Sequence, residues 1–277
     1  MKVVNYSPIA FYLDRGLQPF RAEYAQSCFG YPIVSPKLTT FTFLVTGLNN
    51  QAKLSLASAY IYDRYDKQVK DITANIREGL SVLELSSTGD TLTAVYRDND
   101  IVMGYLPDGL YYIKLNIKGD ERLNIDLYSD LFSVRSEFSG CIKLVGSNSY
   151  AISLPEGAID FTKGGFRFTY IVSSTLARPE YVYEEEVVSR LGYKFTESIV
   201  SKKTYKFVFL AVETLLDSLR LFKLFDNRVI YELNADGSPR YEYRPISFNM
   251  APEWLEQGDV AQVSCDFDVD NIAIRLG

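Results

Sequence analysis

The stretch YYIKLNIKGDERLNIDL, residues 111–127, alternates apolar and polar side chains on both sides of a polar turn. The apolar positions of its two halves are Tyr111, Ile113, Leu115, Ile117, Leu123, Ile125 and Leu127. A period of two is that of a β-strand, because successive side chains of a strand point to opposite faces. The stretch therefore predicts an antiparallel hairpin with one face in the core and the other in water.

Shorter strand signals precede this hairpin at regular spacing. They lie at residues 40–45, 57–62, 81–85 and 91–96, and a polar turn at 87–90 joins the last two as a second hairpin. About seven strands within roughly a hundred residues, with turns every 8–12, predict a β-sandwich over residues 36–137. Residues 1–35, interrupted by Pro8, Pro19 and Pro32, predict an N-terminal arm or an opening strand.

The pattern restarts after a boundary near residues 136–140. Strand signals follow at 140–145, 165–172, 181–184, 203–210, 229–233, 241–243 and 260–268. Between them, apolar side chains recur at helical spacing over residues 214–225 and predict a helix. Its apolar surface is so wide that a sheet or another subunit must cover it. The predicted fold class is mainly β: an N-terminal β-sandwich, then a second β-rich (α+β) domain, residues 138–277, with one embedded amphipathic helix.

Composition narrows the function. Tyr 21 and Phe 17 against Trp 1 favour half-buried sheets and contact surfaces. The chain has no histidine, which excludes Ser-His-Asp and Cys-His catalysis and most transition-metal sites. The net charge of −6, without a basic cluster, argues against nucleic-acid binding.

Cysteine use and hydropathy indicate where the chain folds. Cys28, Cys141 and Cys265 are odd in number and far apart, so they predict three reduced thiols rather than disulfides or a metal site. No apolar run has the length of a signal peptide or a membrane span. We expect assembly in a reducing cytoplasm, with no membrane partner.

Two acidic groups suggest chemistry, and each has a simpler interpretation. Asp266, Asp268 and Asp270 alternate as in a calcium loop, but the glycine and the later glutamate of that loop are missing, so the wet face of a strand is favoured. Glu184, Glu185 and Glu186 could serve glycoside hydrolysis, although a charged edge strand is commoner. No phosphate-binding glycine motif occurs. We predict no catalytic residue, no metal and no cofactor.

Tyrosine pairs raise a different possibility. Tyr60 and Tyr62 share one face of a strand, as do Tyr241 and Tyr243. Such pairs could stack on sugar rings in a carbohydrate-binding module, but they more often stabilise a sheet by cross-strand packing.

The second half also carries a resemblance. Residues 211–230, AVETLLDSLRLFKLFDNRVI, and residues 252–267, PEWLEQGDVAQVSCDF, resemble the C-terminal part of structural proteins of tailed bacteriophages and prophages of gut bacteria, of the tail or baseplate kind. The resemblance covers about residues 165–277, and residues 1–140 carry no comparable mark. It implies a β-rich virion subunit that assembles into a ring or a tail complex and needs no cofactor.

The expected function is therefore that of a virion structural protein from the tail, baseplate or neck region, and not that of an enzyme. Its expected partners are copies of itself, as a homo-oligomer, and other virion tail proteins, met in the host cytoplasm. The alternative is a cell-surface adhesin or carbohydrate-binding module, and a glycosidase without histidine is a third hypothesis. The candidate contact residues are Leu215, Leu219, Leu221, Phe222, Phe225, Tyr241, Tyr243 and Trp254.

Overall fold

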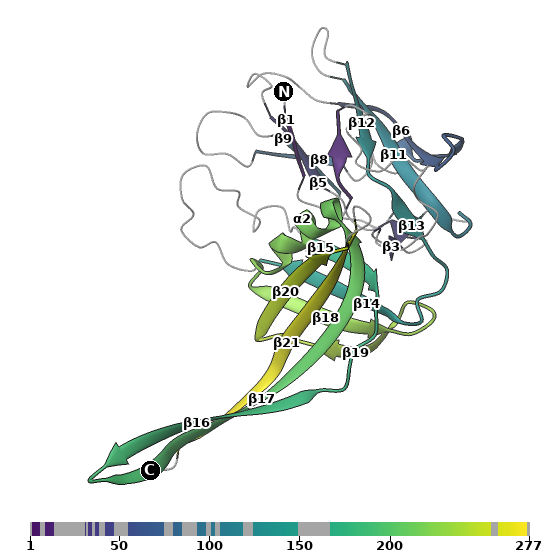
Figure 1. Ribbon diagram of the computed structural model, residues 1–277. Coiled ribbons are helices and arrows are strands. Elements are labelled where there is room, and N and C mark those ends of the chain that lie inside the picture. Colours follow the sequence, from purple (N-terminus) through teal and green to yellow (C-terminus); the bar gives the residue numbers. More distant parts are fainter. Residues whose placement is uncertain are drawn as a thin grey trace.

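The structure is a computed structural model that describes residues 2–5, 9–13, 31, 33–34, 37–38, 42–46, 55–74, 80–84, 93–97, 101–102, 106–118, 124–148, 167–255 and 260–275. These residues form antiparallel sheets and the helix α2, so the mainly β fold class is confirmed (Figure 1). Within them, no helix is long and apolar enough to cross a membrane.

The described residues of the first half of the chain form thirteen strands. They are β1 (Lys2–Asn5), β2 (Phe11–Tyr12), β3 (Ile33–Val34), β4 (Lys37–Leu38), β5 (Thr42–Thr46), β6 (Ser55–Asp63), β7 (Gln68–Asp71), β8 (Leu80–Glu84), β9 (Thr93–Arg97), β10 (Ile101–Val102), β11 (Gly109–Lys118), β12 (Asn124–Ser129) and β13 (Phe132–Val134). They build a four-stranded sheet, β1-β5-β9-β8, a short pair, β10-β4, and a seven-stranded sheet around β11.

The hairpin predicted from residues 111–127 is confirmed as β11 and β12. Leu115 lies opposite Leu127, and Ile117 lies opposite Ile125. All four side chains are buried, as the alternating pattern requires. The second predicted hairpin is also present, because β8 and β9 pair antiparallel.

The described residues among the first 35 belong mostly to the sheets rather than to an extended arm. β1 pairs with β5, β2 pairs with β12, and β3 runs parallel to β13. Phe11 is fully buried, so this stretch helps to build the core. Of the two interpretations of the N-terminal stretch, its described part supports the opening strand.

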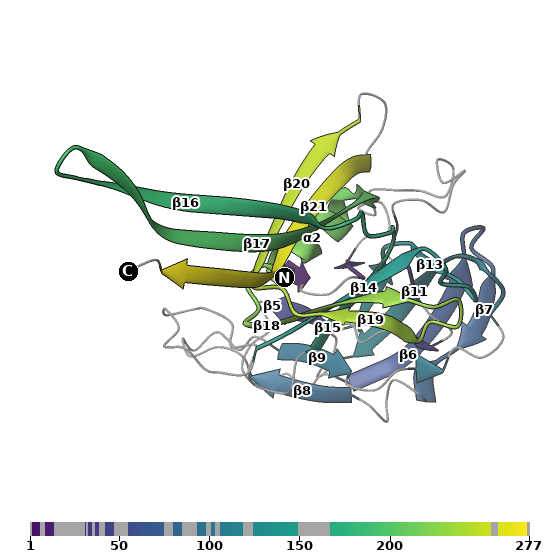
Figure 2. The same ribbon diagram turned by 90° about the horizontal axis from the view of Figure 1, so that it is seen from below.

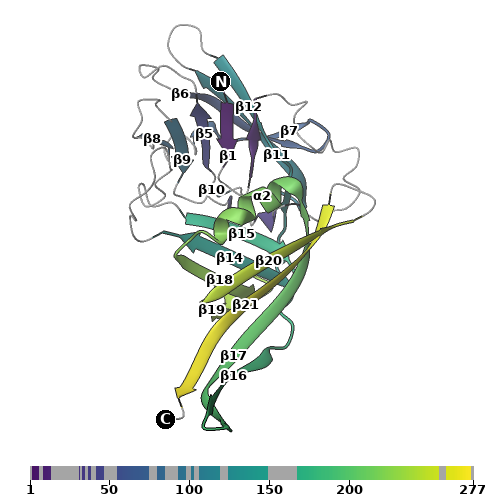
Figure 3. The same cartoon turned by 60° about the vertical axis from the view of Figure 1, so that its left-hand side comes forward.

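The second half supplies the remaining elements. They are β14 (Cys141–Ser147), β15 (Arg167–Ser173), β16 (Glu180–Arg190), β17 (Tyr193–Val212), α2 (Glu213–Phe222), β18 (Asn227–Leu233), β19 (Pro239–Tyr243), β20 (Ser247–Trp254) and β21 (Val260–Arg275). Two four-stranded sheets result, in the orders β15-β14-β18-β19 and β16-β17-β21-β20. The strands predicted at residues 229–233 and 241–243 are present as β18 and β19, which pair antiparallel (Figure 3).

A large buried cluster joins the two halves. Tyr31, Leu110, Tyr112 and Leu131 share it with side chains of both C-terminal sheets and of α2. The chain passes between sheets at the predicted boundary, where β13 ends at Val134 and β14 begins at Cys141. The division into two separate domains stays a prediction, since the buried side chains form one cluster across it.

Helix α2 packs on the sheets of its own chain. It was expected over residues 214–225 and spans Glu213–Phe222, after which Lys223 and Leu224 form a turn. Leu215, Leu219 and Phe222 are buried in the large cluster. The cover that its apolar surface requires is therefore intramolecular for these side chains.

A buried carboxyl group ties α2 to the N-terminal half. Asp130 is almost fully buried, accepts a hydrogen bond from Leu131 N at 2.8 Å, and accepts another from the Thr214 hydroxyl in the first turn of α2. Burial raises the pKa of Asp130 from 3.8 to about 6. A carboxylate held in this position costs stability whenever it is ionised.

This gives a pH-dependent prediction for Asp130→Asn. A raised pKa means that Asp130 contributes stability below about pH 4, and that this contribution is lost as pH rises through about 6. The amide does not titrate, so the variant should gain about 3 kcal/mol relative to wild type between these limits. Urea denaturation of both proteins across the window measures the difference. A difference that stays constant with pH contradicts the assigned origin.

Candidate interaction surface

A narrow β-ribbon projects from the body of the molecule (Figures 1 and 2). β16 and β17 form a hairpin in which Glu180 lies opposite Thr204 and Arg190 lies opposite Tyr193. The outer part of β21 adds a third strand, with Arg275 opposite Ser198. We call residues 180–204 and 269–275 the arm. β20 pairs with β21 only as far out as Asp268, so it does not reach the arm.

The tip of the arm is a two-residue turn. Leu191 and Gly192 have φ values of 53° and 82°, which are those of the mirror-image turn that suits the twist of a hairpin. Asparagine or glycine adopts this conformation readily, whereas leucine pays about 1–2 kcal/mol in it. Leu191 is also 99% exposed. Local stability therefore does not explain a leucine at this position.

The arm also concentrates apolar surface. Fifteen large apolar side chains are exposed among the described residues, and six of them lie in the arm. They are Tyr181, Val182, Tyr183, Val187, Leu191 and Tyr193. Grouped apolar side chains of this kind mark interaction sites, while single ones are normal on any surface.

These side chains occupy both faces of the ribbon. Tyr181 and Tyr183 point to one face and Val182 to the other, because side chains alternate along a strand. All residues of β16 are exposed except Val188, which is half-buried. A ribbon that buries neither face draws little stability from its own packing. Its geometry fits a segment that is completed by another protein.

Ion pairs run across one face of the arm. Lys202 Nζ lies 2.6 Å from Glu184 Oε1, and Lys206 Nζ lies 2.7 Å from Glu180 Oε2 just inside the arm. The hydrogen bond to Glu184 raises the pKa of Lys202. Exposed pairs of this kind stabilise a fold only slightly. In both ion pairs the negative side chain belongs to β16 and the positive one to β17, so charge is distributed unequally across the width of the ribbon.

The glycosidase hypothesis for Glu184, Glu185 and Glu186 gains no support from their place on an exposed strand. Glu184 and Glu186 lie on the face of Lys202 and Ser198, whereas Glu185 lies on the opposite face, beside Ile199. Glu184 and Glu186 share a face, but all residues of this part of β16 are exposed, and no cleft surrounds them among the described residues. The preferred interpretation, a charged edge strand, is confirmed by the order of the sheet.

The aspartates of β21 are engaged in hydrogen bonds. Asp268 accepts from Thr204 Oγ1 at 2.5 Å and from Ser247 Oγ at 2.8 Å, and Asp266 accepts from Asn249 Nδ2 at 3.0 Å. The side chain of Asp270 lies outside the described part. Within the described part, no three Asp, Glu, His or Cys side chains gather as metal ligands.

The predicted contact residues divide into two groups. Leu215, Leu219, Phe222 and Phe225 are buried in the protein's own core, so proposing them as contact residues was wrong. Leu221 is half-buried against the same cluster. The helical period identified an apolar surface correctly, but it carries no information on whether that surface meets the same chain or another one.

The other predicted contact residues lie on strands. Tyr243 is half-buried, with its ring centre 4.9 Å from that of Tyr205. Tyr241 and Trp254 are each 52% exposed and stay candidates for contact. Trp254 lies at the end of the edge strand β20.

One tyrosine of each predicted pair packs against aromatic rings of the protein's own core. Tyr62 lies opposite Tyr112, and their rings stack with centres 5.2 Å apart. Tyr243 packs against Tyr205 and Phe267. Cross-strand packing, the simpler interpretation, therefore accounts for Tyr62, whereas Tyr243 packs between the two C-terminal sheets.

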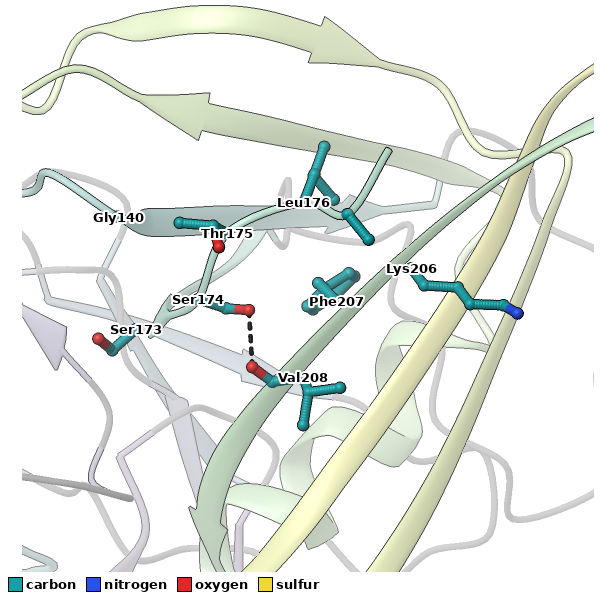
Figure 4. Close-up of a pocket in the computed structure, with 9 residues that line it drawn as sticks. Gly140, Ser173, Ser174, Thr175, Leu176, Lys206, Phe207 and Val208 are labelled. Carbon is teal, nitrogen blue, oxygen red and sulfur yellow. Dashed lines mark hydrogen bonds between the residues drawn. The ribbon is translucent and has the colours of Figure 1, made fainter. Parts of the chain in front are cut away.

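A hollow of about 490 Å³ lies where the arm joins the body (Figure 4). Its lining consists of Gly140, Ser173, Ser174, Thr175, Leu176, Ala177, Lys206, Phe207 and Val208. Ser174 Oγ donates to Val208 O at 2.7 Å, and Ala177 N donates to Lys206 O at 2.8 Å. Lys206, the charged side chain of the lining, points away from Ser174 and pairs with Glu180. These hydrogen bonds hold the segment before β16 against β17. The lining residues do not form a group of catalytic side chains.

Sequence reasoning missed the tip of the arm. Val187, Leu191 and Tyr193 were not singled out, because Gly192 is the only turn signal at this point and leucine is not typical of a two-residue hairpin turn. No protein-family model, no curated protein and no solved structure matches this chain.

Proposed function

We propose that this chain is a structural subunit of a bacteriophage virion, from the tail, baseplate or neck region, and that it acts by binding copies of itself and neighbouring tail proteins. The observation that carries the proposal is the arm, a projecting ribbon with exposed apolar side chains on both faces. Such a ribbon gains most of its stability when another protein covers it.

The resemblance to phage structural proteins supports the proposal from a second direction. It covers about residues 165–277, and this range includes the whole arm. Tyr62 and Tyr243 are half-buried and pack against other aromatic rings, which weakens the case for them as sugar-stacking side chains of a carbohydrate-binding module. We expect no cofactor and no catalytic activity, with the virion as the place of action.

The proposal is tested on phage particles produced by the bacterium that encodes the chain. We expect the full-length chain to co-purify with tailed particles, and gold-labelled antibodies against it to mark the tail or the neck in electron micrographs. A chain that stays in the particle-free fraction, while known tail proteins sediment with the particles, would overturn the proposal.

A further inference from the structure

The arm has two long strand edges. In the described part of the chain, β16 pairs with β17 alone, and residues 269–275 of β21 also pair with β17 alone. Each edge therefore presents a row of backbone N–H and C=O groups that can bond to a further strand. Neither edge contains proline, which would interrupt such pairing.

The two edges lie at the same height along the arm. Glu186 and Arg275 are both in register with Ser198, and Tyr181 and Asp270 are both in register with Lys203. Residues 181–186 on one edge of the three-stranded ribbon therefore lie at the same position along its length as residues 270–275 on the other edge. Copies related by rotation about an axis that runs parallel to the arm can therefore meet edge to edge at this level.

Charge decides between the two ways in which copies can join. A twofold symmetry axis would pair β16 of one copy with β16 of another. Each of these two neighbouring strands carries Glu180, Glu184, Glu185 and Glu186. Like charges on directly neighbouring strands are destabilising. Residues 269–275 carry one aspartate and one arginine, so pairing β16 with this edge avoids the repulsion. It also leaves no strand edge of the arm unpaired.

We propose that β16 of one copy pairs with the outer part of β21 of the next copy, so that the arms form a continuous sheet between subunits around a cyclic axis. The partner is a second copy of this chain. The inference rests on the proposed function, because it names one of the partners that the arm binds. Repetition of the same contact closes a ring when the rotation closes.

Cysteine pairs across the two edges test this arrangement in the full-length chain, with Cys28 replaced by alanine and the buried Cys141 and Cys265 retained. Glu184→Cys is combined in turn with Asn271→Cys, Ala273→Cys or Arg275→Cys, positions in register with Lys202, Val200 and Ser198. Within one copy β17 separates the edges by about 10 Å, two strand spacings. A disulfide needs Cα atoms less than about 7 Å apart, so a bond requires a neighbouring copy.

We expect at least one double variant to give a ladder of disulfide-linked oligomers on mild oxidation, and the single variants to stay uncrosslinked. A dimer from Glu184→Cys alone would overturn the inference in favour of β16–β16 pairing. Oligomers that sediment normally without any crosslink would overturn it while leaving the proposed function intact. A chain that is monomeric and absent from particles would defeat both.

Discussion

Replacing Tyr181, Tyr183 and Leu191 together by serine should weaken self-association at least about 100-fold. Each side chain that is buried at an interface contributes about 1–2 kcal/mol, and three of them exceed the roughly 3 kcal/mol that such a factor represents. The three residues are exposed in the single copy and belong to the arm. Sedimentation velocity over a range of concentrations measures the change.

A matched triple variant controls for the loss of apolar surface in general. Tyr65, Val69 and Leu224 are exposed large side chains outside the arm. Their replacement by serine should leave the association constant unchanged, because surface apolar residues that stand alone contribute little. Equal weakening by both triple variants would show that the arm has no special part in assembly.

Phe222→Ala should lower the free energy of unfolding by about 3–5 kcal/mol. Phe222 is fully buried at the end of α2, with its ring edge-on to Phe248 at 4.9 Å and to Tyr170 at 6.4 Å. The truncation removes these contacts and leaves a cavity between the helix and both C-terminal sheets. Chemical denaturation monitored by circular dichroism measures the loss.

Leu224→Ala is the companion control, since Leu224 follows the same helix but is 72% exposed. Its replacement should change stability by less than about 0.5 kcal/mol. Should Phe222→Ala cost under about 1 kcal/mol, α2 would not be the cover of the core that the structure shows.

The strands with a strict period of two were predictable from sequence. Apolar and polar side chains alternate regularly along β11 and β12. A shift of the strand register by one residue would therefore expose every apolar side chain to solvent. The strand pairs β8–β9 and β18–β19 were equally predictable from sequence, because a polar turn lies between the two strands of each pair.

β20 was missed for a physical reason. Pro252 lies inside it, and proline argues against a central strand. The structure places β20 at the edge of its sheet, where one side needs no hydrogen-bond donor. Sequence does not reveal which strand will stand at an edge, because that depends on the order of the whole sheet.

The arm was missed for a related reason. Residues 181–184 and 203–210 were predicted as strands, but their length and their projection from the body were not. Burial depends on what lies above each face, and periodicity in β16 is the same whether a face is covered or not. The residues of α2 show the converse, because their apolar face was identified and its partner was assigned wrongly.

The most direct test of the proposed role is sedimentation velocity of the unmodified full-length chain over a wide concentration range, beside a variant in which residues 183–201 are replaced by a two-residue Asn-Gly turn, which is closed by the paired residues Val182 and Lys202. We predict discrete oligomers for the intact chain and a folded monomer for the shortened one. An intact chain that remains monomeric at the highest concentration, or a shortened chain that assembles as well as the intact one, would contradict the account.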